Sequence, residues 1–171
     1  MTNATPADLP HHISPFDEAK FRQVLGHFAT GVAVITAVDE DEPVGLAIGS
    51  FTSVSLDPPL VGFFPSMLSS SWPRIHNAGF FCVNILSERQ EDICRVFASR
   101  GADKFSSIGW KHGRTGAPII NDVLAWAECT IERVDEVGDH WFVLGRVVDL
   151  DVVHEGGPLI FFRGGYGRYE I

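Results

Sequence analysis

Residues 125–153 read AWAECTIERVDEVGDHWFVLGRVVDLDVV. From Ala127 to Glu132 apolar and polar side chains alternate, which is the two-residue period of a strand with one buried face. Gly138-Asp139-His140 then provides a turn motif, and a second apolar run continues from Trp141 to Val153. Two long strands joined by so short a turn pair antiparallel, so this stretch predicts a long β-hairpin.

The rest of the sequence predicts more strands than helices. A short helix is expected between Trp72 and Gly79, and another after the capping box at 87–90, ending near Ser99. Further strands are predicted at 31–38, 44–51, 60–64, 80–86 and 159–163, with a Ser-rich segment at 52–60 and a polar connection at 101–116. Because hairpin-length turns join most strands, the predicted fold is mainly β with helices. It is an antiparallel barrel with two or three flanking helices.

An N-terminal helix is predicted to begin at Ser14, because a proline follows at the first helical position and an acid at the third. Its apolar face is formed by Phe21, Val24, Leu25 and Phe28. Thr30-Gly31 is expected to end it. We expect residues 1–13, which are polar and aperiodic, to be a flexible tail, and residues 14–171 to form one domain.

The charge balance and the cysteines exclude several classes of protein. Thirteen basic and 22 acidic residues give a net charge of −9, which disfavours nucleic acid or an anionic membrane as a partner. The longest apolar runs are too short to span a bilayer. Cys82, Cys94 and Cys129 are odd in number and widely spaced. They therefore predict neither a disulfide framework nor a zinc site, and they favour a cytoplasmic location.

Three short segments contain side chains that could bind a nucleotide. Four hydroxyl groups lie within six residues between Ser50 and Ser55, and hydroxyls together with backbone N–H groups can bind phosphate. His140 lies on a turn that would expose and orient its imidazole, and Lys104-Phe105 puts a cation beside an aromatic ring. Each pattern also fits an ordinary structure: a polar strand edge, a surface turn, or a loop with one buried Phe.

Other catalytic motifs are missing from the sequence. Neither GxGxxG nor GxxxxGK[ST] occurs, so a bound nucleotide would have neither a Rossmann nor a P-loop cradle. There is no GxSxG elbow, and no metal-ligand spacing emerges from the histidines. The cysteines lie within strand and helix runs, which is typical of buried thiols. This disfavours a Cys-His hydrolase that uses Cys94 or Cys129.

Taken together, these segments resemble the short-chain flavin reductases, the NAD(P)H:flavin oxidoreductases that serve two-component flavin monooxygenases. The resemblance extends over residues 16–169. The motifs that carry it are Phe28-Ala29-Thr30-Gly31-Val32, the segment from Ser50 to Leu60, Asn84-Ile85-Leu86, Asp103-Lys104-Phe105, Gly138-Asp139-His140 and Arg163-Gly164-Gly165-Tyr166. It implies a split β-barrel that binds flavin at a homodimer interface.

The resemblance also implies a cofactor site. The segment from Ala47 to Ser55 would hold the flavin ring edge, ribityl chain and phosphate, and His140 would face the nicotinamide. The region 63–73 varies among relatives and could reach the second phosphate or adenine of FAD, so both FAD and FMN stay open, as do NADH and NADPH. The residues expected to bind cofactor are Ala47, Ile48, Ser50, Phe51, Thr52, Ser53, Ser55, Ser70, Trp72, Asn84, Lys104, Phe105 and His140.

The predicted function is a flavin reductase that transfers a hydride from NAD(P)H to FAD or FMN and supplies reduced flavin to a partner monooxygenase. Because the flavin accepts the hydride, the protein only has to orient two planar rings, and it needs no nucleophile or metal. His140 would then act as an orienting hydrogen-bond donor. The alternative is a non-catalytic flavin-binding split barrel, and NADH oxidation upon addition of flavin would distinguish the two.

Overall fold

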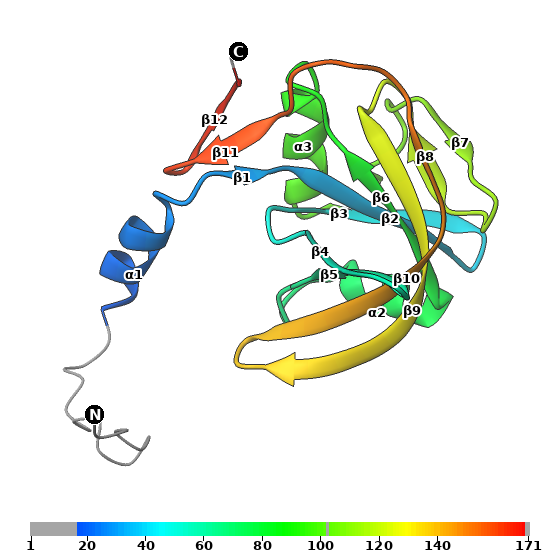
Figure 1. Ribbon diagram of the computed structural model, residues 1–171, viewed down its shortest axis with the longest axis horizontal. Helices are drawn as coiled ribbons and strands as arrows, with labels where there is room; N and C mark the ends of the chain where they lie inside the picture. Colours follow the sequence, from blue (N-terminus) through cyan, green and yellow to red (C-terminus); the bar gives the residue numbers. More distant parts are fainter. Residues whose placement is uncertain (1–16, 102, 170–171) are drawn as a thin grey trace.

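The computed structural model describes residues 17–101 and 103–169, and most of its strands belong to one seven-stranded antiparallel sheet (Figure 1). The strand order is β3-β2-β6-β9-β10-β5-β4. The sheet curls into a barrel, but its edge strands β3 and β4 are not paired with each other, so the barrel is split between them. The first five strands of this sheet along the chain are β2 (Ala33–Asp39), β3 (Glu42–Ile48), β4 (Thr52–Leu56), β5 (Pro59–Phe63) and β6 (Phe80–Ile85).

The predicted long hairpin is confirmed as β9 (Ala125–Val137) and β10 (His140–Val152). Gly138 adopts a φ of 62°, which a residue without a Cβ accommodates at no steric cost. Two register shifts, at Leu144/Gly145 and Val147/Asp149, interrupt the pairing of the strands. Such irregularities increase local twist and bend, which helps the sheet to curl.

The barrel interior is filled by aromatic and β-branched side chains from facing strands. Phe63 of β5 and Phe81 of β6 are fully buried, and their ring centroids lie 5.2 Å apart in an edge-to-face arrangement. Helix α2 (Trp72–Ala78) adds Trp72 and Ile75 to the same cluster. The predicted short helix is therefore confirmed.

A second apolar cluster forms on the other face of the sheet. Helix α3 (Glu91–Ala98) places Phe97 against Val34 of β2 and against the small hairpin of β7 (Trp110–His112) and β8 (Pro118–Ile120), through Ile120. This packing fixes the carboxyl end of α3 beside β3. Both elements contribute to the walls of the candidate site described below.

A segment from the first part of the chain pairs with one from its last part outside the barrel. Strands β1 (Thr30–Gly31), β11 (Ile160–Phe162) and β12 (Gly165–Gly167) form a three-stranded sheet, and helix α1 (Glu18–Leu25) projects from it away from the barrel (Figure 1). We call residues 17–28 the N-terminal arm. The Asp17 carboxylate caps α1 by accepting the N–H groups of Ala19 and Lys20.

Several predicted boundaries differ from the structure. The first helix ends at Leu25, well before Thr30, because Gly26 caps it. The apolar face predicted for it is exposed to solvent, and Phe28 is 77% accessible. Residues 52–60, the Ser-rich segment, form β4 and the start of β5, so the interpretation of this segment as a polar strand edge is confirmed. The predicted Ser14 cap and the tail at 1–13 lie outside the described residues.

The helix after the capping box is also shifted. Gln90 Oε1 accepts the N–H of Ser87, as a capping box requires, but α3 begins one turn later at Glu91. Ser87 is held instead in an isolated bridge with Pro158. Over the part of the chain that the structure describes, three helices are present, and none has the length and apolar character needed to cross a membrane.

Candidate active site

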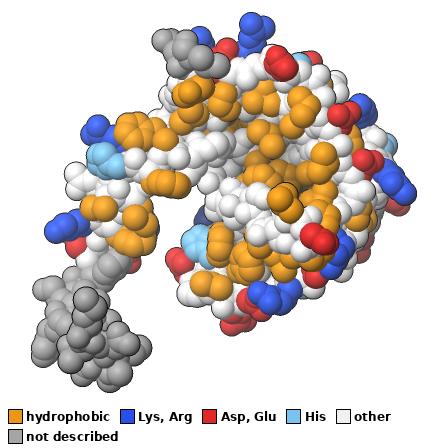
Figure 2. Space-filling view, in the orientation of Figure 1, with side chains coloured by type: hydrophobic (Ala, Val, Ile, Leu, Met, Phe, Trp, Pro, Cys, Tyr) orange, Lys and Arg blue, Asp and Glu red, His pale blue; other side chains and the backbone are white. Residues whose placement is uncertain are grey.

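A cleft of about 1010 Å³ lies between the N-terminal arm and the barrel. Figure 2 shows the hollow that separates the two parts. Its walls come from the arm, the end of β3, the loop from Phe64 to Ser71, the carboxyl end of α3 and the start of β10. Segments that are far apart in the sequence therefore converge on one concave surface.

The barrel wall of the cleft is the segment from Leu46 to Ser50. A Cβ added at Gly49 would lie 2.9 Å from Oγ1 of Thr30. Glycine at this position therefore lets Thr30, which follows the arm, pack closely against the wall. Ser50 then fixes the opposite wall, because its Oγ accepts the N–H of Phe64 at 3.0 Å. A planar ligand could lie against this exposed backbone edge.

His140 reaches the cleft because two backbone hydrogen bonds attach its turn to the loop beside it. Met67 N donates to the carbonyl of Asp139 at 3.0 Å, and Trp141 N donates to the carbonyl of Pro65 at 2.9 Å. These bonds place the imidazole, whose side chain is 43% exposed, on the rim of the cleft. The predicted turn and the accessibility of His140 are both confirmed.

The imidazole is oriented by its neighbour in the turn. His140 Nδ1 lies 2.7 Å from Oδ1 of Asp139, and this hydrogen bond holds the pKa of the Asp139 carboxyl below its usual value. An ionised carboxylate can only accept, so Nδ1 carries the proton. Nε2 of the neutral ring is then an acceptor, and it donates only when the ring is protonated.

Lys104 supplies a buried positive charge to the cleft. Lys104 is only 9% exposed, and its Nζ donates to the carbonyls of Phe97 at 2.9 Å and Gly45 at 3.3 Å. Burial lowers the pKa of the Lys104 ammonium. No carboxylate within the described ranges 17–101 and 103–169 forms an ion pair with it, so its charge has no counter-ion.

The structure brings six of the predicted site residues to the cleft. They are Ala47, Ile48, Ser50, Ser70, Lys104 and His140. Phe51 and Thr52 lie in an adjoining pocket of about 420 Å³ that shares Ser50 and Thr30 with the cleft. Ser53 and Ser55 lie further along β4 and do not line either cavity.

Three predicted site residues lie in the core instead of the cleft. Asn84 is fully buried on β6, where its amide donates to Thr36 Oγ1 and accepts the N–H of Ile120. Trp72 packs against Phe63 inside the barrel. Phe105 packs edge-to-face on Phe97. The two aromatic rings pack against other aromatic rings, and the Asn84 amide bonds to buried partners. The periodicity of the sequence could not reveal that these side chains face the core.

Sequence patterns missed several residues of the cleft. Phe28 lies in a motif of the family resemblance, and Phe64, Ser66 and Ser69 lie in the region 63–73 that was expected to reach FAD, but none was named as a binding residue. Arg100 and Phe161 also line the cleft, and no pattern singled them out. Phe28 had a signal, because it continues an apolar helical face yet lies beyond the helix end. The others become neighbours only when the barrel and the arm are assembled.

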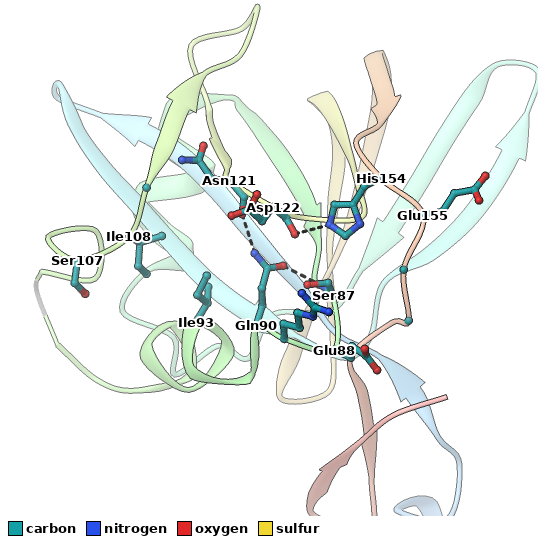
Figure 3. A pocket seen from close by; sticks show the side chains of 14 residues that line it. Ser87, Glu88, Gln90, Ile93, Ser107, Ile108, Asn121, Asp122, His154 and Glu155 are labelled. Atoms are coloured by element: carbon teal, nitrogen blue, oxygen red, sulfur yellow. Dashed lines mark hydrogen bonds between the residues drawn. The ribbon is translucent and has the colours of Figure 1, made fainter. Parts of the chain in front are cut away.

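A second cavity, of about 810 Å³, lies at the start of α3 (Figure 3). Two of its polar side chains are bonded to backbone carbonyls: Gln90 Nε2 donates to the carbonyl of Asn121, and His154 Nε2 lies 3.0 Å from the carbonyl of Asp122. It contains none of the predicted site residues. The cleft is therefore the site to which the sequence and the structure both point.

The cysteines do not reach the cleft. Cys82, Cys94 and Cys129 are free and buried, and burial raises the pKa of all three thiols, that of Cys129 to about 12. A thiol that stays protonated and buried is a poor nucleophile, so the hydrolase alternative has no support. Within the described part of the chain, no group of three His, Cys, Asp or Glu side chains could hold a metal.

The fold is a split β-barrel, and its main cleft combines an exposed strand end, hydroxyl groups and a buried cation. The chain belongs to the flavin reductase like domain family, whose pattern matches residues 25–170. The predicted resemblance and the split-barrel fold are thereby confirmed.

Individual relatives agree with this assignment. The chain is 50% identical to a flavin reductase of Pseudomonas putida over 157 residues, which cover 91% of this chain and 92% of that protein. It is similar to nitrilotriacetate monooxygenase component B from Mycobacterium thermoresistibile, with a TM-score of 0.88 and 47% identity over 90% of this chain and 87% of that one. A Streptomyces globisporus NADH:FAD oxidoreductase in complex with NAD and FAD fragments has a TM-score of 0.86 and 37% identity, covering 92% and 95%.

Proposed function

We propose that the cleft binds an oxidised flavin and that the protein reduces it with NAD(P)H. A bound flavin accepts the hydride, so the nicotinamide is oxidised, the flavin is reduced and one proton is taken from solvent. The reduced flavin is supplied to a partner monooxygenase, the role that the names of several relatives carry. Everything else that the reaction requires is positioning, which the cleft residues provide.

The residues of the cleft fit a flavin nucleotide. The backbone from Leu46 to Ser50 offers hydrogen-bonding groups at the edge of a planar ring, and Phe28 and Phe161 offer apolar surface. Ser50 and Ser70 supply hydroxyl groups for the polar side of the ligand. Lys104, a buried cation without a counter-ion, supplies the charge for a phosphate.

His140 orients the second substrate in this proposal. Its Nδ1 is held by Asp139, so the neutral ring presents Nε2 to the cleft as an acceptor. An acceptor there suits the carboxamide N–H of a nicotinamide, whereas the sequence led us to expect a donor. In this proposal His140 keeps the nicotinamide as its partner, with the direction of the hydrogen bond reversed while the ring is neutral.

The convergence of Ala47, Ser50, Lys104 and His140 on one cleft is the observation that carries the proposal. Steady-state oxidation of NADH and NADPH, with FMN, FAD and riboflavin tested in parallel, is the corresponding experiment. We expect turnover only when flavin is added. Flavin binding without any nicotinamide oxidation would instead support the alternative of a non-catalytic flavin-binding barrel.

We further propose that the protein is a homodimer. Exposed apolar side chains continue along the second half of β10, where Leu150 is 62% and Val152 is 67% accessible, and Leu56 on β4 is 92% accessible. The apolar face of the arm adds Val24 and Leu25. Surfaces of this kind are usually covered by a partner. A cytoplasmic location, expected from the three unpaired cysteines, stays a prediction.

A further inference from the structure

A side chamber of about 270 Å³ adjoins the cleft, next to the proposed flavin phosphate contact. The two cavities share Ser70, Ser71 and Lys104 in their walls, so they communicate at these residues. The chamber continues beyond them to Arg74 of α2 and to Gly45 of β3. It is small and polar, so it suits a compact hydrogen-bonding group better than an aromatic ring.

The chamber contains two hydroxyls and two cations but no acidic side chain among its lining residues. Lys104 stands at the junction, with no counter-ion among the described residues. Ser71 precedes α2 without making a capping hydrogen bond, so its hydroxyl is available on the chamber side. A buried, unneutralised cation is costly unless an anion completes the site.

Arg74 is held in place from behind by Asp39. Its Nε donates to Asp39 Oδ2 at 3.1 Å, and Asn77 donates to the other carboxylate oxygen at 2.6 Å. A terminal nitrogen of Arg74 also donates to the carbonyl of Asp39 at 3.5 Å, so the guanidinium is fixed at two nitrogens, while the N–H groups of the third have no described bond. Because the Arg74 side chain is 39% exposed, the guanidinium can still be reached by a ligand.

We propose that this side chamber holds the second phosphate of a bound dinucleotide, contacted by Arg74 and Ser71, while Lys104 serves the first phosphate in the cleft. The inference rests on the proposed function and adds a structural basis for preferring a dinucleotide over a ligand with one phosphate. The order along the walls supports it: Lys104 lines both cavities and Arg74 lines the chamber alone. A ligand with one phosphate reaches Lys104, and only a diphosphate extends to Arg74.

The diphosphate could belong to FAD or to the nicotinamide dinucleotide, and the experiment separates these sources. Equilibrium binding of FMN, FAD and riboflavin is measured without NAD(P)H for the wild type and for Arg74→Gln. If the chamber serves FAD, Arg74→Gln raises the Kd of FAD about 10-fold or more, while FMN and riboflavin stay within about 2-fold. If it serves the nicotinamide dinucleotide, flavin binding is unchanged, and the KM for NADH, measured with FMN, rises instead.

Three controls keep the result interpretable. Arg146→Gln removes an exposed, ion-paired arginine on β10 that lines neither cavity, and should change no Kd. Asp39→Asn loosens the support of Arg74 while keeping its charge, so it should weaken binding of the same dinucleotide, by less than Arg74→Gln does. Ser71→Ala serves if Arg74→Gln unfolds early in a thermal melt, and should weaken binding of the same dinucleotide about 3-fold.

Two outcomes would overturn the inference. One is a Kd for FAD and a KM for NADH that both stay within about 2-fold in Arg74→Gln and Ser71→Ala. The other is equal weakening of FMN and FAD, which would place Arg74 at the first phosphate. Failure of the proposed function looks different, because the wild-type protein would then oxidise no NAD(P)H with any flavin.

Discussion

His140 is the residue whose replacement tests the proposed chemistry most directly. His140→Ala removes one oriented contact to the nicotinamide and leaves the flavin wall at 46–50 intact. We expect kcat/KM for NADH to fall roughly 10- to 100-fold, equivalent to about 1.4–2.8 kcal/mol, with little change in flavin affinity. Stopped-flow reduction of the flavin-loaded variant measures this, with dithionite reduction as the control. A wild-type rate would contradict the assigned role.

Lys104 gives the flavin site a pH dependence with a definite sign. Burial lowers the Lys104 pKa, and only the charged ammonium attracts phosphate. Affinity for FMN should therefore be full below this pKa and should decline as the pH rises through it, towards the usual lysine value of about 10.4. Riboflavin has the same ring and no phosphate, so its Kd should follow no such trend.

The matched variant for this prediction is Lys104→Met. It removes the charge and keeps much of the length of the side chain, so the decline in FMN affinity with pH should disappear. Titrations of FMN and riboflavin between about pH 7 and pH 10.5 provide the measurement. Parallel curves for the two ligands in the wild-type protein would show that Lys104 does not contact the phosphate.

The buried thiols lead to a prediction about reactivity. The raised pKa of Cys129, about 12, leaves about one thiolate in ten thousand near pH 8, and Cys94 and Cys82 are shifted in the same direction. Iodoacetamide should therefore leave NADH oxidation unchanged in the native protein and modify all three thiols after denaturation. Rapid inactivation, with one native cysteine modified, would reopen the possibility of thiol chemistry.

At the scale of elements, the contact between β3 and α3 shapes one side of the cleft. A Cβ added at Gly45 would lie 2.7 Å from the buried ring of Phe97 and 3.1 Å from the carbonyl of Ile35. Gly45→Ala should push α3 outward and lower the free energy of unfolding by about 1–3 kcal/mol. Because Lys104 is bonded to the carbonyls of both Gly45 and Phe97, FMN affinity should fall as well.

Chemical denaturation and FMN titration together measure the effect of Gly45→Ala. Gly167→Ala is the control, since a Cβ there would have no neighbour within 4 Å. Loss of stability with unchanged FMN binding would separate the packing of α3 from the placement of Lys104. In that case the strand and the helix would support the fold without positioning the phosphate contact.

At the scale of the whole molecule, the exposed apolar surface predicts a stable dimer. Sedimentation equilibrium at micromolar concentration should give twice the mass of 18.8 kDa. Leu150→Glu, which places a charge in the exposed strip of β10, should weaken association at least about 10-fold, since an unpaired charge is costly to bury. A fully active wild-type monomer at that concentration would contradict both the dimer and its part in the site.

The sequence by itself determined the parts of this protein that depend on neighbours along the chain. Alternation along 125–137 and the turn at Gly138-Asp139 were enough for the β9–β10 hairpin, because strand period and turn chemistry are local properties. The burial of the cysteines followed in the same way, from residues in periodic runs. The class of cofactor was implied by the resemblance to a family, which rests on motifs in a fixed order.

Only the tertiary structure decided which side chains meet. Asn84 and Lys104 both belong to motifs that resemble a cofactor site, yet packing buries the Asn84 amide among backbone partners and brings the Lys104 ammonium to the cleft. The arm, the loop at 64–71 and the end of α3 meet only when the barrel curls. Whether a polar side chain faces a ligand or the core is fixed by these long-range contacts, and no short-range pattern encodes them.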